Sequence, residues 1–187
     1  MTVLEVLKMV SLYLNLYDNF KILFEGGSLS SNEDEVELQK ILSGINLTAK
    51  SLSCLFKLKT KEEIVIDKTQ SFDLELLSKP LNQICVIKDN QNKSHTFKIY
   101  SNKVLTDFSG KANIEYFYFP ANVTNVSDKI EINSKVSIKT FAMGVVCEYC
   151  YINNLFDDAV VWEERFNKSL KAKTLSSSFL MPSKRWL

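Results

Sequence analysis

Histidine, arginine, glycine and proline are all scarce in this 187-residue sequence, which has one His, two Arg, five Gly and three Pro. The few glycines form no G-x-x-x-x-G-K-[ST] loop of the kind that holds a nucleotide phosphate. Neither G-x-S-x-G nor H-E-x-x-H occurs, so common serine-hydrolase and zinc-protease motifs are missing as well. Because no catalytic motif is present, we expect that the chain is not an enzyme.

Long apolar runs and an excess of charge of one sign are lacking too. No stretch reaches the ~18 apolar residues that a membrane span needs. Glu5 interrupts the first apolar run, and no basic segment precedes it, which is not the layout of a signal peptide. The 23 basic and 22 acidic residues give a net charge of +1, without the basic excess of nucleic-acid-binding domains. Four cysteines are too few for a dense disulfide framework, so a reducing, cytosolic environment is expected.

Apolar residues make up 45% of the sequence, which is ample for a folded core, and at both ends they recur at helical spacing. Residues 3–24 carry a wide apolar face that predicts a helix, with a candidate break near Asn15–Asn19. Gly26 and Gly27 end this helix. Residues 33–56 form the second predicted helix, because an acidic run favours a helix N-terminus and apolar residues then repeat every three or four positions.

The period changes to short β-branched and aromatic runs in the middle of the chain. Residues 62–67, 83–87, 96–100 and 114–119 are separated by polar turn residues, which predicts strands of a small antiparallel sheet. Helical spacing returns after Ser134, a candidate N-cap, and Asn153–Asn154 separates two further predicted helices. These patterns predict two helices, a β insertion, and two more helices.

The sequence therefore predicts an α+β fold, because neither pair of helices can bury its apolar face alone. We expect a four-helix bundle in which the N-terminal helices, residues 1–58, pack against a C-terminal helical hairpin, residues 133–173. The inserted antiparallel β-sheet module covers residues 59–132. Residues 174–187 are expected to form an extended C-terminal tail.

Cys147 and Cys150 form a C-x-x-C pair, for which three interpretations are open. A redox dithiol normally opens a helix, where the helix dipole lowers the thiol pKa, but this pair lies about three turns inside a predicted helix. A zinc site needs about four ligands, and the other cysteines and His95 are isolated in the sequence. Free cysteine is also among the most buried residue types. The favoured interpretation is packing in the core, and a redox pair is the next alternative.

Other candidate catalytic groups have simpler interpretations. His95 lies in a polar segment, which is typical of a surface histidine although histidine is the commonest general base. Glu163–Glu164 and Glu33–Asp34–Glu35 lie where solvated charge is expected on a helix. We therefore expect no catalytic residue, no cofactor and no metal.

Residues 143–170 carry a more specific pattern. Gly144, Glu148, Tyr149 and Cys150 lie on one helix, a short Asn-Asn loop follows, and the next helix begins with Asp157-Asp158-Ala159 and continues as W-x-x-R-F from Trp162. This stretch resembles the C-terminal helical hairpin of tailed-bacteriophage head-to-tail adaptor proteins, the group that includes tail tubular protein A.

Three further segments agree with this resemblance. The segment "IEYFYFP" at 114–120 is similar to the Y-x-x-x-P segment of the family, and "VLKMVSLYLNLYDN" at the start is similar to its first helix. The chain ends in "PSKRWL", which resembles a P-x-R-R-W ending, with Lys184 where arginine is more usual. The order of helices, sheet and helices also matches the family.

The resemblance implies a structural virion protein without enzymatic activity. Such adaptors form rings, commonly of twelve subunits, that join the portal vertex to the downstream tail or neck protein and extend the channel through which DNA leaves the particle. The implied location is the neck of the phage particle, after assembly in the host cytoplasm, with no membrane contact. DNA would pass through the channel without sequence-specific binding.

The same resemblance assigns roles to two sets of residues. A closed ring needs two different complementary surfaces on each subunit. The candidates for docking to a partner lie at the C-terminus, where aromatic and Arg side chains are typical anchors: Lys184, Arg185, Trp186 and Leu187. The motif expected in the bundle core is Tyr149, Trp162 and Phe166. The alternatives are a protein-binding accessory module that forms no ring and, more remotely, a thiol redox protein using Cys147 and Cys150.

Overall fold

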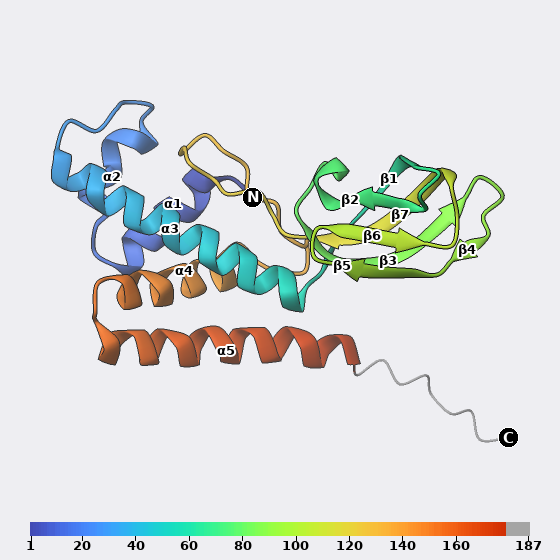
Figure 1. The fold of residues 1–187 in the computed structure, drawn as a ribbon. Coiled ribbons are helices and arrows are strands. Elements are labelled where there is room, and N and C mark those ends of the chain that lie inside the picture. The colour runs from blue at the N-terminus through green and yellow to red at the C-terminus, as the bar shows by residue number, and fades with distance from the viewer. Residues whose placement is uncertain (179–187) are drawn as a thin grey trace, which may run out of the picture. The chain divides into compact units, whose positions relative to one another are not determined.

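The computed structural model describes residues 1–178, with side chains through residue 172. It confirms the α+β class but shows that the predicted four-helix bundle is wrong, because the described chain contains five α-helices and seven strands in two antiparallel sheets (Figure 1). The chain divides into two compact units. One comprises residues 1–51 and the chain from residue 122 onward, and the other comprises residues 52–121.

The first predicted helix is two helices, α1 (Val3–Tyr13) and α2 (Tyr17–Phe24). The break comes from Asn15, whose φ of 57° is left-handed and cannot continue a right-handed helix. The amide of Leu16 reaches back to the carbonyl of Ser11 at 2.8 Å, which satisfies a carbonyl that the helix end leaves open. Gly26 ends α2 in the same way with a φ of 83°. The candidate break near Asn15–Asn19 is therefore confirmed.

Three longer helices complete the helical unit: α3 (Asn32–Leu55), α4 (Ile138–Ile152) and α5 (Phe156–Ser178). Ser137, and not the expected Ser134, caps α4, because the Ser137 hydroxyl accepts the Thr140 amide at 3.3 Å. Asn154 ends α4 with a φ of 58°, as the Asn-Asn signal predicted. The last helix continues to Ser178, past the predicted start of the tail at residue 174.

The helix α4 is the centre of the helical unit and packs against both α3 and α5 (Figure 1). Gly44 of α3 and Gly144 of α4 allow this close packing. A Cβ atom at Gly44 would lie 3.1 Å from the Val145 carbonyl oxygen, and one at Gly144 would lie 2.7 Å from the Thr48 methyl carbon. Side chains of α1 also contribute to the core, with Val3, Val6, Leu7 and Val10 fully buried.

The segment that leads back from the β unit, residues 122–137, is hydrogen-bonded to the start of the chain. The Val3 amide donates to the Asp128 carbonyl at 3.0 Å, and the Ile130 amide donates to the Met1 carbonyl at 2.9 Å. The Asn46 side chain bonds the amide and the carbonyl of Val123, at 2.8 and 3.0 Å. These bonds satisfy backbone groups of an irregular segment that would otherwise lose hydrogen bonds on burial.

The second unit contains two antiparallel sheets where the sequence predicted one small sheet. The strand order is β1-β7-β3-β4 in one sheet and β2-β6-β5 in the other. The strands are β1 (Leu58–Ile66), β2 (Ser71–Asp73), β3 (Leu81–Asp89), β4 (Ser94–His95), β5 (Phe97–Tyr100), β6 (Lys103–Thr106) and β7 (Gly110–Tyr118), and a short 3-10 helix, η1, spans Leu74–Leu76. The chain changes sheet at Thr96, between β4 and β5.

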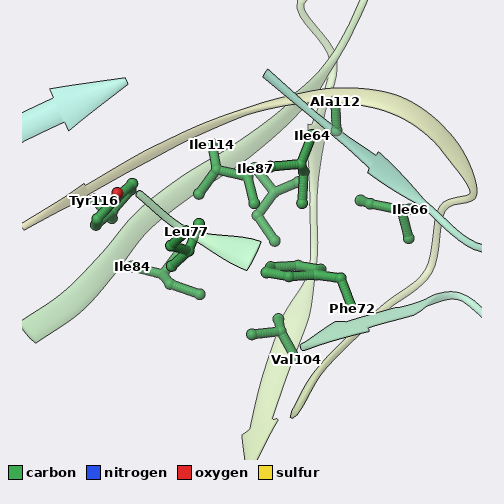
Figure 2. Packing of buried hydrophobic residues seen from close by; sticks show 10 residues of the cluster. All are labelled: Ile64, Ile66, Phe72, Leu77, Ile84, Ile87, Val104, Ala112, Ile114 and Tyr116. Atoms are coloured by element: carbon green, nitrogen blue, oxygen red, sulfur yellow. The ribbon is translucent and has the colours of Figure 1, made fainter. Parts of the chain in front are cut away.

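Side chains from both sheets share one core. Ile64 and Ile66 of β1 alternate with exposed residues, as expected for a strand with one buried face. Figure 2 shows Phe72 of β2 and Val104 of β6 in the same cluster as Ile87 of β3. Burying an aliphatic or aromatic side chain contributes about 1.5–3 kcal/mol, so this cluster stabilises the unit around both sheets. No helix within residues 1–178 is long and apolar enough to span a bilayer.

Candidate functional site

The C-x-x-C pair lies in the helical core. Cys147 is 5% exposed and Cys150 is 2% exposed, and none of the four cysteines forms a disulfide. The Cys147 thiol lies 3.6 Å from the Ala159 carbonyl oxygen of α5. Burial, reinforced by Glu148 and Glu163, raises the pKa of the Cys147 thiol to about 12, and burial also raises the pKa of Cys150. Since the thiolate is the reactive form, this environment disfavours redox chemistry and favours a packing role.

The predicted core motif is distributed over two helices and contacts three different partners. Tyr149 is 9% exposed, and its hydroxyl donates to the Glu37 carboxylate of α3 at 2.5 Å. Trp162 is half-buried and packs on the Tyr13 ring, with 5.1 Å between ring centroids. Phe166, also half-buried, lies over Gly144. Tyr149 therefore joins α4 to α3, Trp162 joins α5 to α1, and Phe166 joins α5 to α4. The motif lies at the border of the core and the solvent.

Arg165 lies beside this motif. In the structure, the guanidinium carbon of Arg165 lies 4.7 Å from the centre of the Trp162 ring, within the range of a cation–π contact. Trp162 therefore contacts both Tyr13 and Arg165.

A polar network links Tyr149 to the loop before α5. The Lys40 ammonium contacts the Glu37 carboxylate at 2.6 Å and the Asn153 side-chain oxygen at 2.8 Å. Burial opposes ionisation of Glu37, but the hydrogen bonds from Lys40 and Tyr149 outweigh it and lower the pKa of Glu37. An ionised Glu37 therefore connects α3 to the C-terminal end of α4.

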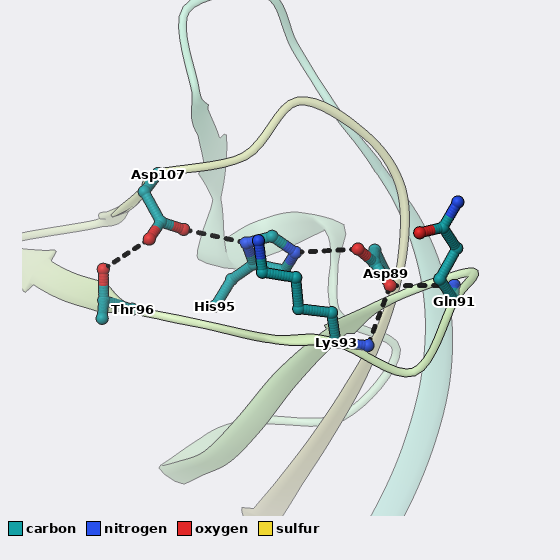
Figure 3. Close-up of polar contacts among 6 residues, drawn as sticks. All are labelled: Asp89, Gln91, Lys93, His95, Thr96 and Asp107. Atoms are coloured by element: carbon teal, nitrogen blue, oxygen red, sulfur yellow. Dashed lines mark hydrogen bonds and ion pairs between the residues drawn. The ribbon is translucent and has the colours of Figure 1, made fainter.

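His95 is the centre of a polar cluster in the β unit (Figure 3). Its Nδ1 lies 3.0 Å from Asp107 Oδ1, and its Nε2 lies 3.1 Å from Asp89 Oδ2. The ring stacks on Phe108, with 4.5 Å between centroids, and the side chain is only 9% exposed. The expectation of a surface histidine is therefore wrong, because two carboxylates more than ten residues apart along the chain enclose the ring.

The geometry gives His95 a structural role, because its ring connects two carboxylates of the β unit through hydrogen bonds. Both ring nitrogens have carboxylate partners, so neither is open to a substrate. The same carboxylates hold backbone and hydroxyl groups, since Asp89 accepts the amides of Gln91 and Lys93, and Asp107 accepts the Thr96 hydroxyl. Within residues 1–178, no group of three or more His, Cys, Asp or Glu side chains is arranged to hold a metal ion.

A groove along α3 is a concave surface of the helical unit, with a volume of about 960 Å³. Val36 and Leu47 lie on the side of α3 opposite its buried face, and they are 54% and 46% exposed. Side chains from α2, α4 and two loops complete the apolar lining, which we call the α3 groove: Leu23, Leu29, Val36, Leu47, Val126 and Ile152.

A second exposed apolar surface lies at the start of α5. Phe156 and Val160 are one helical turn apart and are 57% and 60% exposed, and Leu155 and Val161 beside them are also exposed. We call these four residues the α5 surface. It lies on a different helix from the floor of the α3 groove. Contiguous exposed apolar surface often marks a protein interaction site.

Sequence periodicity did not identify either surface as a site. In α3, Val36 and Leu47 are eleven residues apart, which places them on the same face of the helix. Apolar residues also mark the buried face of α3, so the sequence alone does not show which of the two faces is exposed. The walls come from distant segments, such as Val126 and Ile152. The docking candidates Lys184, Arg185, Trp186 and Leu187 lie outside the described residues.

Comparison with known proteins gives no family assignment, since no protein-family model and no curated protein matches the chain.

Proposed function

We propose that this protein is a virion structural protein that forms a ring, of about twelve subunits, between the portal vertex and the tail of a phage particle. Two sequence features support the proposal: the resemblance of residues 143–170 to the helical hairpin of head-to-tail adaptors, and the similar C-terminal ending. The order of three helices, a β unit and two helices is compatible with it. The ring extends the DNA channel and has no catalytic task.

The observation that carries the proposal is the pair of different apolar surfaces on one helical unit. A ring with head-to-tail contacts needs two unlike, complementary surfaces on every subunit. The α3 groove is concave, and the α5 surface is on a helix whose outer side is exposed. In the proposed ring, one copy contributes its groove side and the next contributes its α5 side.

Charge distribution is compatible with a channel through which DNA moves. Many Lys and Arg contacts to phosphates would bind the duplex tightly and slow its passage. The net charge of the chain is +1, and several lysines of the β unit are paired with carboxylates, as in Lys59 with Glu115 at 2.5 Å and Lys111 with Glu63 at 3.6 Å. We propose that the portal and the next tail protein contact the β unit.

A binding module that forms no ring is the second candidate. The α3 groove favours it, because an open apolar groove of this size also accommodates a peptide of an unrelated partner. The two candidates differ in stoichiometry: a module forms a small complex, whereas the adaptor forms a ring on the portal.

The proposal is tested by producing the chain together with the portal protein encoded in the same phage genome. Electron microscopy is expected to show an added ring on the portal. Val36→Asp in the groove and Val160→Asp on the α5 surface should each prevent the ring, because a charge would be buried without a partner. Leu12→Asp is the matched control, since Leu12 of α1 is 56% exposed and belongs to neither surface. Portals without an added ring in the unmodified sample would refute the proposal.

A further inference from the structure

The α3 groove has the length of a short extended peptide. Val36 and Leu47 mark the two ends of the apolar part of its floor, and eleven residue steps at 1.5 Å give this part a length of about 16 Å. An extended chain covers about 3.3 Å per residue, so about five residues fill this length. The apolar lining offers places for large apolar side chains.

The charges beside the groove are predominantly acidic. Glu35 lines it, and Glu33 and Asp34 precede it in the first turn of α3. The one lysine in the lining, Lys40, is already paired with Glu37 at 2.6 Å. A ligand that combines large apolar side chains with positive charge therefore complements both the lining and the rim.

The sequence beyond the described residues has this composition. Residues 179–187 read FLMPSKRWL, with Lys184 and Arg185 directly before Trp186 and Leu187. The last five residues match the length of the apolar floor, and four residues remain to connect them to α5. Trp and Arg are also the side chains most often found as anchors in protein interfaces.

The groove lies too far away for the basic pair of the same copy. The helix α5 begins beside the groove, because Lys40 of α3 bonds Asn153 at 2.8 Å. It then runs in the same direction as α3, since Phe166 and Thr48 meet at Gly144. Its 23 residues carry the chain about 33 Å away from that end. Seven further residues to Arg185 span at most about 25 Å, which does not return the basic pair to the acidic rim.

We propose that residues 183–187 of one copy occupy the α3 groove of a neighbouring copy. Trp186 and Leu187 fill the apolar lining, while Lys184 and Arg185 face Glu33 and Glu35 at the rim. This proposal identifies the segment that binds the groove in the proposed ring. It rests on the proposed function only because it requires neighbouring copies of the chain. Residues 179–182 bridge the space between the two copies.

The test is photo-crosslinking with the full-length chain. Trp186 is replaced by benzoylphenylalanine, and equal amounts of protein labelled with nitrogen-14 and nitrogen-15 are mixed at the highest concentration that stays dispersed. After irradiation, mass spectrometry should find residue 186 joined to the segment between Val36 and Leu47. The joined peptides should include as many mixed-isotope pairs as same-isotope pairs, because the contact is between copies.

Variants separate groove binding from non-specific contact. Val36→Asp and Leu47→Asp should lower the crosslink yield about tenfold, whereas Val65→Asp should leave it unchanged. Lys184→Glu with Arg185→Glu should also lower the yield, and Glu33→Lys with Glu35→Lys should restore it in that background. All of these described positions are exposed, and circular dichroism checks the fold of each variant.

Three outcomes would overturn the inference: crosslinks only within one copy, crosslinks to another surface, or none. The proposed function is tested separately on portal complexes. A ring that assembles while residue 186 crosslinks elsewhere retains the function and refutes the groove contact. A groove crosslink between copies that never join a portal retains the contact and refutes the function.

Discussion

Cys147 and Cys150 show how burial decides the role of a reactive residue type. Both thiols lie inside α4, and their pKa values are raised because the charged thiolate would lose its hydration. The sequence spacing alone suits redox chemistry, metal binding or packing. The sequence favoured packing on one ground only, which is that the pair lies about three turns from the start of the predicted helix.

Replacing both residues tests the packing role. We expect Cys147→Ser with Cys150→Ser to lower the free energy of unfolding by about 1–3 kcal/mol, because two hydroxyls replace apolar thiols in the core. Denaturant unfolding measures the change, and ring formation on the portal measures function. A folded variant that fails specifically in a thiol-dependent assay would contradict the account and support the redox alternative.

Gly144 is the residue on which the close packing of three helices depends. A Cβ atom there would lie 2.7 Å from the Thr48 methyl carbon and 3.0 Å from the Phe166 ring. Gly144→Ala is therefore expected to lower the free energy of unfolding by about 1–3 kcal/mol despite its better helix propensity. Thermal unfolding measures the change. Adding Thr48→Ser, which removes the methyl group, should recover part of the loss, and no recovery would contradict this contact.

At the scale of elements, hydrogen bonds of the Asp89–His95–Asp107 cluster connect strands of the β unit to their turns. Hydrogen bonds from His95 to Asp89, and from Thr96 and His95 to Asp107, lower the pKa of each carboxyl. Their ionised forms therefore stabilise the folded state. This contribution is fully present above the unfolded pKa of about 3.9 and is lost as the pH falls through the lower folded pKa.

The pH dependence gives a test of this cluster. His95→Gln should lower stability at pH 7, because it removes the charge-assisted partner of both carboxylates. The difference between the variant and the unmodified protein should shrink below about pH 4, where the carboxylates become protonated. Urea unfolding followed by circular dichroism over this range measures it. A constant difference across the range would show that the carboxylates are not responsible.

Local signals predicted the positions of most elements, and particular residues explain the failures. Asn153–Asn154 and Gly26 mark helix ends in the structure as they do in the sequence. Asn15 also turns the chain, within the candidate break that the sequence indicated at Asn15–Asn19. The second sheet was missed because two of its strands, β2 and β6, have only three and four residues, which is too short for a clear period-two pattern.

At the scale of the whole molecule, the interaction surfaces arise only when distant segments meet. Tyr149 and Glu37 are 112 residues apart, and their hydrogen bond helps to hold α4 beside the α3 groove. The sequence could place Tyr149 on an apolar helix face, but it could not pair it with a carboxylate on another helix. The same limit applies to the groove, whose walls come from α2, α4 and two loops.

The central claim is that this chain is a ring component of a phage particle. The most direct measurement is mass spectrometry of purified particles of the phage that encodes it, with peptide amounts scaled to the portal protein. We predict about one copy of this chain for each portal subunit, as expected for a ring that continues the portal symmetry. Absence of the chain from intact, tailed particles would contradict the claim.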